Sequence, residues 1–141
     1  MAVVLAAPRQ AAPTLVRWVV SLHVLALLVQ IAAAVALTSG WPEAFIVHAT
    51  VGHLLFLLGI CQGIAVMSVR SVRQSPLTAS MAGILPLPEA LQIYLGHVGL
   101  LAWHLTLGLL IWGGALAIWI RVSAIVVGRG ENPGTSAVTR N

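Results

Sequence analysis

The sequence predicts an all-α integral membrane bundle of four transmembrane helices, and three observations lead to that fold class. Of the 141 residues, 60% are hydrophobic and only 7% are charged, whereas a soluble domain carries about 25% charged residues. A chain with so few polar groups cannot cover a water-facing surface, so its apolar side chains must face lipid. The apolar residues also form segments close to the roughly 20 residues that cross a bilayer, and the charges gather between them.

The first two spans have clear ends. Residues 1–13 are small and include prolines, so we expect a disordered tail before a first span over residues 14–38. A short turn, Ser39 to Pro42, follows. Pro42 suits the first turn of a helix, and Glu43 places an anion where the helix dipole favours it, so the second span covers residues 43–69. A polar link with Arg70 and Arg73 comes next.

Two readings fit the stretch that follows. In the first, residues 77–96 and 100–122 are the third and fourth spans, joined by a tight turn at Gly96–Gly99. In the alternative, one long helix from Pro88 to Val127 gives three spans. Pro86, Pro88 and Glu89 make residues 77–96 the weakest of the four, open to a break or to partial re-entry. The bundle thus extends over residues 14–127, and residues 128–141 form a second disordered tail.

Arginine positions favour four spans. Arginine gathers on the cytoplasmic side of membrane proteins. With four spans, both termini are cytoplasmic, the outer links carry no arginine, and one side receives all of Arg9, Arg17, Arg70, Arg73, Arg121 and Arg129. We therefore expect a multi-pass protein of the inner (plasma) membrane. The complete replacement of lysine by arginine is typical of a bacterium with a GC-rich genome.

The two halves of the chain share a pattern. Gln30 late in one span precedes His48 and Gly52 in the next, and Gln92 precedes His104 and Gly108 in the same way. Eleven residues after each histidine comes a further small residue, either Gly59 or Ala115. Offsets of four and eleven return to within about 40° of the starting direction on a helix. Each histidine therefore shares a face with small residues, although chance is the alternative for so short a pattern.

Five histidines lie at or near membrane depth. Ionisable side chains there usually face the bundle interior, and a single one is often only a hydrogen-bond partner. Zinc or copper needs three or four converging donors, whereas His48 and His53 point about 140° apart on their helix. A metalloporphyrin needs only one or two axial imidazoles, an apolar slot and small residues against its ring.

The predicted ligands are His48 and His104, on helices two and four, with haem b between them. Gly52, Gly59, Gly108 and Ala115 are the residues expected against the ring. The alternative metal ligands are His53, His97 and His23. A chlorophyll-type pigment, or no cofactor, is the alternative to haem.

Over residues 14–122 the chain resembles the small four-helix haem-b membrane proteins, in particular one half of haem A synthase. In that family the second and fourth helices of each half carry histidines near the outer side, and the matching residues here are His48 and His104. The family pairs two bundles and has a Glu-x-x-His-Arg motif, which this chain lacks. The resemblance therefore implies a haem-binding scaffold rather than synthase activity.

These patterns favour a b-type cytochrome, or a haem-bearing membrane-anchor subunit, that transfers electrons. The alternative is a non-catalytic accessory or pigment-binding subunit of a larger membrane complex. The expected partners are membrane lipid, other subunits and a quinone. Nucleic acid is not expected, because the chain has no basic run. No nucleophile–base or carboxylate pair is visible and Cys61 lies in an apolar segment, so we expect no catalytic centre of its own.

Overall fold

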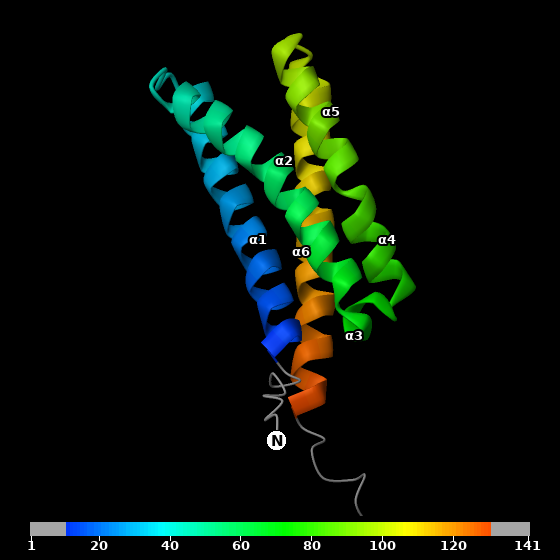
Figure 1. Ribbon diagram of the computed structural model, residues 1–141. Helices are drawn as coiled ribbons and strands as arrows, with labels where there is room; N and C mark the ends of the chain where they lie inside the picture. The colour runs from blue at the N-terminus through cyan, green and yellow to red at the C-terminus, as the bar shows by residue number, and fades with distance from the viewer. Residues whose placement is uncertain (1–10, 131–141) are drawn as a thin grey trace, which may run out of the picture.

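The computed structural model describes residues 11–130, and every regular element in that range is a helix. The prediction of an all-α chain is therefore confirmed for the described residues. In chain order the helices are α1 (Ala11–Thr38), α2 (Ala44–Ser68), α3 (Arg70–Arg73), α4 (Pro76–Ile84), α5 (Pro86–His97) and α6 (Leu101–Gly130). Figure 1 shows α1, α2 and α6 as long rods, with α4 and α5 following one another along the side of α6.

Three of the described helices, α1, α2 and α6, are long and apolar enough to cross a membrane. This number agrees with the alternative of three spans and corrects the expectation of four continuous ones. The expected third span is divided into α4, with 9 residues, and α5, with 12, and each is shorter than the roughly 20 residues of a span. The division falls at Leu85, because Pro86 and Pro88 have no N–H to continue the helical hydrogen bonds.

The single helix from Pro88 to Val127 does not form either. The chain turns at residues 98–100, where Gly99 has a φ of +74°, a left-handed conformation that glycine adopts without steric cost. Gly40 has a φ of +91° in the corresponding link between α1 and α2. Both links are therefore short turns that reverse the chain.

The predicted disordered tails lie mostly outside the described residues, at 1–10 and 131–141. Where they overlap the structure, the chain is helical. Residues 11–13 begin α1, because Pro13 lies in the first helical turn, where a missing N–H has no partner to lose. Residues 128–130 continue α6, and the next proline, Pro133, comes only after them.

The helices form two antiparallel pairs, α1 with α2 and α5 with α6. α1 also packs against α6, and α2 against α4 and α5. The pairs lie close together near α3 and diverge toward the end that carries the two glycine turns (Figure 1). We call these the closed end and the open end.

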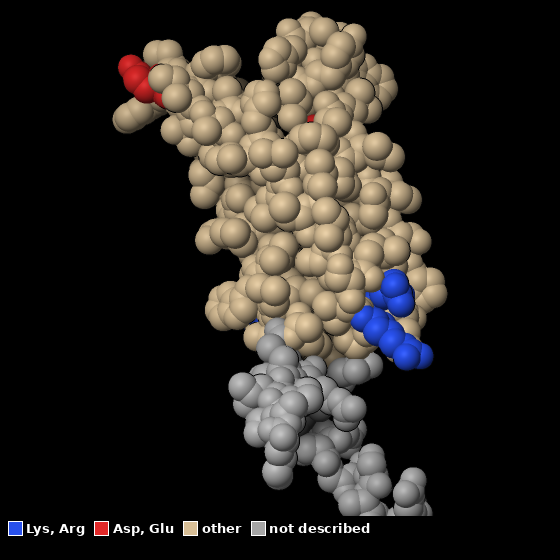
Figure 2. All heavy atoms as spheres, viewed as in Figure 1, with Lys and Arg blue, Asp and Glu red and all other residues tan. Residues whose placement is uncertain are grey.

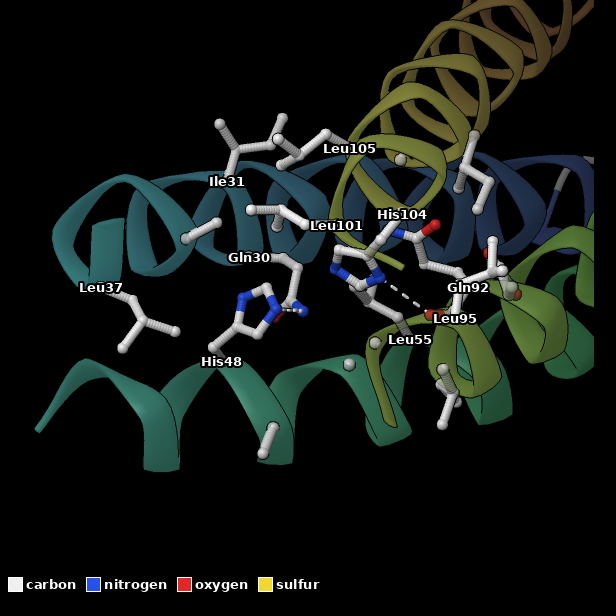
Figure 3. A pocket seen from close by; sticks show the side chains of 18 of the residues that line it. Gln30, Ile31, Leu37, His48, Leu55, Gln92, Leu95, Leu101, His104 and Leu105 are labelled. Carbon is white, nitrogen blue, oxygen red and sulfur yellow. Dashed lines mark hydrogen bonds between the residues drawn. The ribbon is translucent and has the colours of Figure 1, made fainter. Parts of the chain in front are cut away.

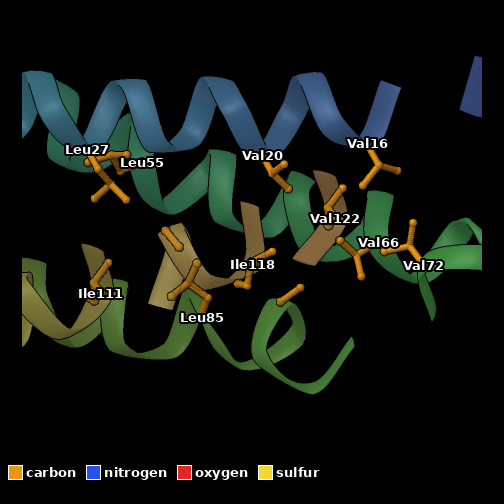
Figure 4. Close-up of a cluster of buried hydrophobic side chains, with 12 residues drawn as sticks. Val16, Val20, Leu27, Leu55, Val66, Val72, Leu85, Ile111, Ile118 and Val122 are labelled. Atoms are coloured by element: carbon orange, nitrogen blue, oxygen red, sulfur yellow. The ribbon is translucent and has the colours of Figure 1, made fainter. Parts of the chain in front are cut away.

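The apolar core occupies the middle and the closed end of the bundle (Figure 4). Its fully buried valines and isoleucine come from α1, α2, α3 and α6, and they are Val16, Val20, Val66, Val72, Ile118 and Val122. Close approach of α2 and α4 depends on Gly63, since a Cβ there would lie 3.0 Å from the backbone oxygen of Ala82. Such close packing is the main source of helix association in lipid, because apolar side chains gain nothing by leaving lipid for one another.

Charge divides between the two ends. Figure 2 shows basic atoms at the closed end and acidic atoms at one tip of the open end, with an uncharged surface between them. The arginines of residues 11–130 lie in α3 or toward the closed-end termini of α1 and α6; they are Arg17, Arg70, Arg73, Arg121 and Arg129. Many large apolar side chains between these ends are exposed, among them Leu54, Ile64 and Leu109. A surface of this kind fits lipid rather than water.

Candidate functional site

A cavity of about 800 Å³ lies between the two helix pairs at the open end. Its volume falls within the range of about 300–1,000 Å³ typical of small-molecule sites. Leucine and isoleucine side chains from α1, α2, α5 and α6 make up much of its wall (Figure 3). Its polar lining consists of one threonine, two glutamines, one acid and four histidines, namely Thr38, Gln30, Gln92, Glu89, His48, His53, His97 and His104.

His48 of α2 and His104 of α6 face each other inside this cavity (Figure 3). Their ring centroids are 5.9 Å apart and the ring planes make an angle of 64°. Both side chains are half-buried. The structure therefore brings together the two histidines that the repeat singled out.

His53 of α2 and His97 of α5 form a second pair at the edge of the same cavity. Their centroids are 6.1 Å apart with perpendicular planes, and both side chains are exposed. Each Nδ1 lies close to the carbonyl oxygen four residues earlier, at 2.7 Å from Ala49 and 2.9 Å from Ile93. Since a carbonyl only accepts, each Nδ1 carries the proton and donates it, which leaves Nε2 with a free lone pair.

His104 is held in the same way. Its Nδ1 lies 2.9 Å from the backbone oxygen of Gln92, to which it donates. Metal-binding histidines commonly donate their second ring N–H to a carbonyl, which fixes the tautomer and the ring orientation. His48 differs, because its Nε2 lies 3.4 Å from Gln30 Nε2 and its buried Nδ1 has no hydrogen-bond partner among the described residues.

The two glutamines cover the glycines of the repeat. A Cβ on Gly52 would lie 3.1 Å from Gln30 Nε2, and a Cβ on Gly108 would lie 2.9 Å from Gln92 Nε2. Both glycines line the cavity, and a glutamine side-chain amide lies over each of them. The sequence pattern included both glutamines, yet it gave them no role in the site.

Gly59 and Ala115 do not line the cavity, in contrast to their predicted place against a porphyrin. A Cβ on Gly59 would collide with the Glu89 carboxylate, and Ala115 is fully buried in the apolar core. At this depth, Gly59 is covered by the Glu89 side chain and Ala115 by the apolar core.

His23, the third alternative ligand, also lies outside the cavity lining. It is fully buried, with Nδ1 3.0 Å from Gln62 Oε1 and Nε2 2.8 Å from Glu89 Oε1. Both ring nitrogens face a side-chain oxygen at close range, and neither faces the cavity lining. The sequence signal for this contact was the intramembrane acid Glu89, since a buried acid needs a partner.

The donor set restricts what the cavity could hold. Within residues 11–130 no three histidine, cysteine or acidic side chains converge on one point that could hold a metal ion. The two pairs of imidazoles, with centroids 5.9 and 6.1 Å apart, are the donors that the cavity offers. One or two imidazoles are what a haem iron takes from a protein. No protein-family model, curated protein or solved structure matches the chain, and the resemblance to half of haem A synthase therefore stays a prediction from the residues.

Proposed function

We propose that this protein is a membrane-embedded b-type cytochrome or haem-bearing anchor subunit, with His48 and His104 as the axial ligands of haem b between α2 and α6. The observation that carries this proposal is the pair of imidazoles, with centroids 5.9 Å apart, inside an apolar cavity of about 800 Å³. A bound haem would supply reversible one-electron chemistry, with a potential set by its ligands and surroundings. A quinone or a partner subunit would exchange those electrons.

Two further features support the fit. His104 already donates its Nδ1 proton to the Gln92 carbonyl, so its Nε2 is the nitrogen left for a metal. Several polar atoms at the cavity are buried without a hydrogen-bond partner among the described residues, namely Gln30 Oε1, Gln92 Oε1 and His48 Nδ1. Each such atom costs about 1–3 kcal/mol, and a ligand with polar edges could satisfy them.

An absorption spectrum tests the proposal. The protein, purified in detergent, is expected to show a haem spectrum whose reduced α-band appears on addition of dithionite. A chlorin spectrum that dithionite leaves unchanged would support the pigment-binding alternative instead. A colourless protein with intact helical circular dichroism would refute cofactor binding altogether.

We further propose that α4 and α5 together cross the membrane as a broken fourth span. They follow one another beside α6 from the closed end to the open end (Figure 1). Interrupted backbone is tolerated at membrane depth where protein covers it, and Leu85 at the break is buried. The arginines then mark the closed end as cytoplasmic, and the cavity opens toward the outer side of a bacterial inner membrane.

Cysteine labelling is expected to place the two ends of α4–α5 on opposite sides. In a Cys61→Ala background, Ser39→Cys and Val98→Cys should react with an impermeant maleimide in intact cells, because both residues are exposed at the open end. Gln74→Cys, exposed before α4, should react only after the cells are permeabilised. Reaction of Val98→Cys and Gln74→Cys from the same side would rule out the crossing.

A further inference from the structure

A buried polar cluster joins α1, α2 and α5 beneath the cavity. It consists of His23 and Gln62, both fully buried, and Glu89, which is 4% exposed. His23 Nε2 lies 2.8 Å from Glu89 Oε1, and His23 Nδ1 lies 3.0 Å from Gln62 Oε1. Glu89 fits there because its carboxylate rests on Gly59, which has no side chain to exclude it. An ionisable pair at membrane depth is costly, and it usually marks a functional site.

The contacts favour one arrangement of protons in this cluster. Gln62 Oε1 can only accept, so His23 Nδ1 carries a proton and donates it. His23 Nε2 and Glu89 Oε1 then need one further proton between them, since two facing lone pairs would repel at 2.8 Å. With that proton on either atom the cluster has no net charge. Without it a carboxylate would be buried without a counter-charge, which is far more costly.

The cluster is in contact with the cavity on one side only. Glu89 is part of the cavity lining. Neither of its buried oxygens has a hydrogen bond of good geometry within the described residues, although Oε1 lies 2.8 Å from His23 Nε2. Toward the closed end, the core side chains Val20, Val66 and Ile118 are apolar and fully buried. A proton therefore has a way to Glu89 from the open end.

Other titratable groups around Glu89 are few. Glu89 contacts His23 of α1. It shares the cavity with His48 and His53 of α2, His104 of α6 and His97 of its own helix, α5. Helix α4 contributes no titratable side chain. Arg17 and Arg121 belong to the closed end, and Cys61 is exposed on the outside of α2. No fixed positive charge in the described chain thus neutralises Glu89 directly.

We propose that His23 and Glu89 form a proton-exchange site that opens to the cavity and is closed toward the arginine-bearing end. A proton from water in the cavity adds to Glu89, which gives a carboxylic acid beside an imidazolium and one net positive charge; its release restores the neutral pair. Resting on the proposed electron-transfer function, this site would couple proton uptake to electron transfer. A haem held in the cavity would supply the electron acceptor, and a quinol or partner subunit the electron; one proton taken up by the pair would balance that added negative charge.

Infrared difference spectroscopy of the full chain in lipid nanodiscs tests the proton site without any need for a cofactor. Between about pH 6 and pH 9, solvated carboxyl groups stay ionised and contribute no carboxylic C=O signal. We expect a pH-dependent carboxylic C=O band that Glu89→Gln abolishes and Glu89→Asp shifts. The matched control is Glu43→Gln, which removes an exposed acid at the tip of the open end and should leave the band unchanged.

The outcomes separate cleanly. Identical difference spectra for the wild-type protein and a folded Glu89→Gln variant, as judged by circular dichroism, would overturn the proton site. If haem is present, its midpoint potential is expected to fall by up to 59 mV per pH unit in the wild type and to become nearly independent of pH in Glu89→Gln. A colourless protein that keeps the infrared band would refute the electron-transfer function while supporting the proton site. A flat potential beside an intact band would refute only the coupling.

Discussion

Replacing His48 or His104 by alanine is expected to abolish the b-type spectrum of the purified protein. Changes to residues that merely support a metal ligand already cost about 10- to 100-fold in affinity, so loss of an axial ligand should lower the haem content per chain at least tenfold. The measurement is haem content by the pyridine haemochrome method, together with the dithionite-reduced spectrum. Added imidazole should partly restore the spectrum, because it can occupy the space of the missing side chain.

The second histidine pair provides the control. His53→Ala and His97→Ala remove the same side chain from the edge of the same cavity, where both residues are exposed, and should retain the spectrum. The ligand assignment is wrong if these two variants lose haem and the other two keep it. In that case the exposed pair, whose centroids are 6.1 Å apart, would hold the iron.

Gly59→Ala is expected to destabilise the fold by about 3 kcal/mol. The new Cβ would occupy the place of the Glu89 carboxylate, and displacing that carboxylate would break its contact with His23 while both groups stay buried. The measurement is the free energy of unfolding in mixed micelles as the fraction of SDS rises. Gly113→Ala is the matched control, since no atom lies within 4 Å of its Cβ position, and its effect should stay within about 0.5 kcal/mol.

A double-mutant cycle distinguishes this collision from a general intolerance of α2 to a larger residue. In a Glu89→Ala background the obstructing carboxylate is absent, so Gly59→Ala should cost much less than in the wild type. An equal cost in both backgrounds would show that Glu89 is not the obstacle.

The ends of the first two long helices could be predicted because local chemistry sets them. The expected spans 43–69 and 14–38 lie within three residues of α2 (Ala44–Ser68) and α1 (Ala11–Thr38) at each end. The region after Arg73 was harder, because Pro86 and Pro88 indicate a break but not its outcome. Whether two short helices continue along one line depends on the surface of the neighbouring helix, which here is α6. The shape of that surface cannot be predicted from the periodicity of the sequence.

The site could be predicted only in part, for a related reason. Helical periodicity and the repeat give His48 and His104 the same depth and facing helices. The contact of His53 with His97 depends on how far the helix pairs diverge and on the start of a separate α5. The partnership of His23 and Glu89 joins residues 66 positions apart in the chain, so it follows from the packing of α1 and α5 against α2 and not from any local pattern.

The repeat has a consequence for the symmetry of the bundle. Gln30 and Gln92 are related by 62 positions and His48 and His104 by 56. A repeat with these offsets would relate the two helix pairs by a pseudo-twofold axis near the facing imidazoles. The same offsets can be applied to the buried polar cluster and to Gly59, which supports it. Each of these residues then corresponds to an apolar residue in the other half: His23 to Leu85, Glu89 to Leu27, Gln62 to Ile118, and Gly59 to Ala115. All eight residues are buried. Two identical hairpins would bury either two acids or none, whereas one continuous chain lets the halves diverge and keep a single acid on one side of the axis.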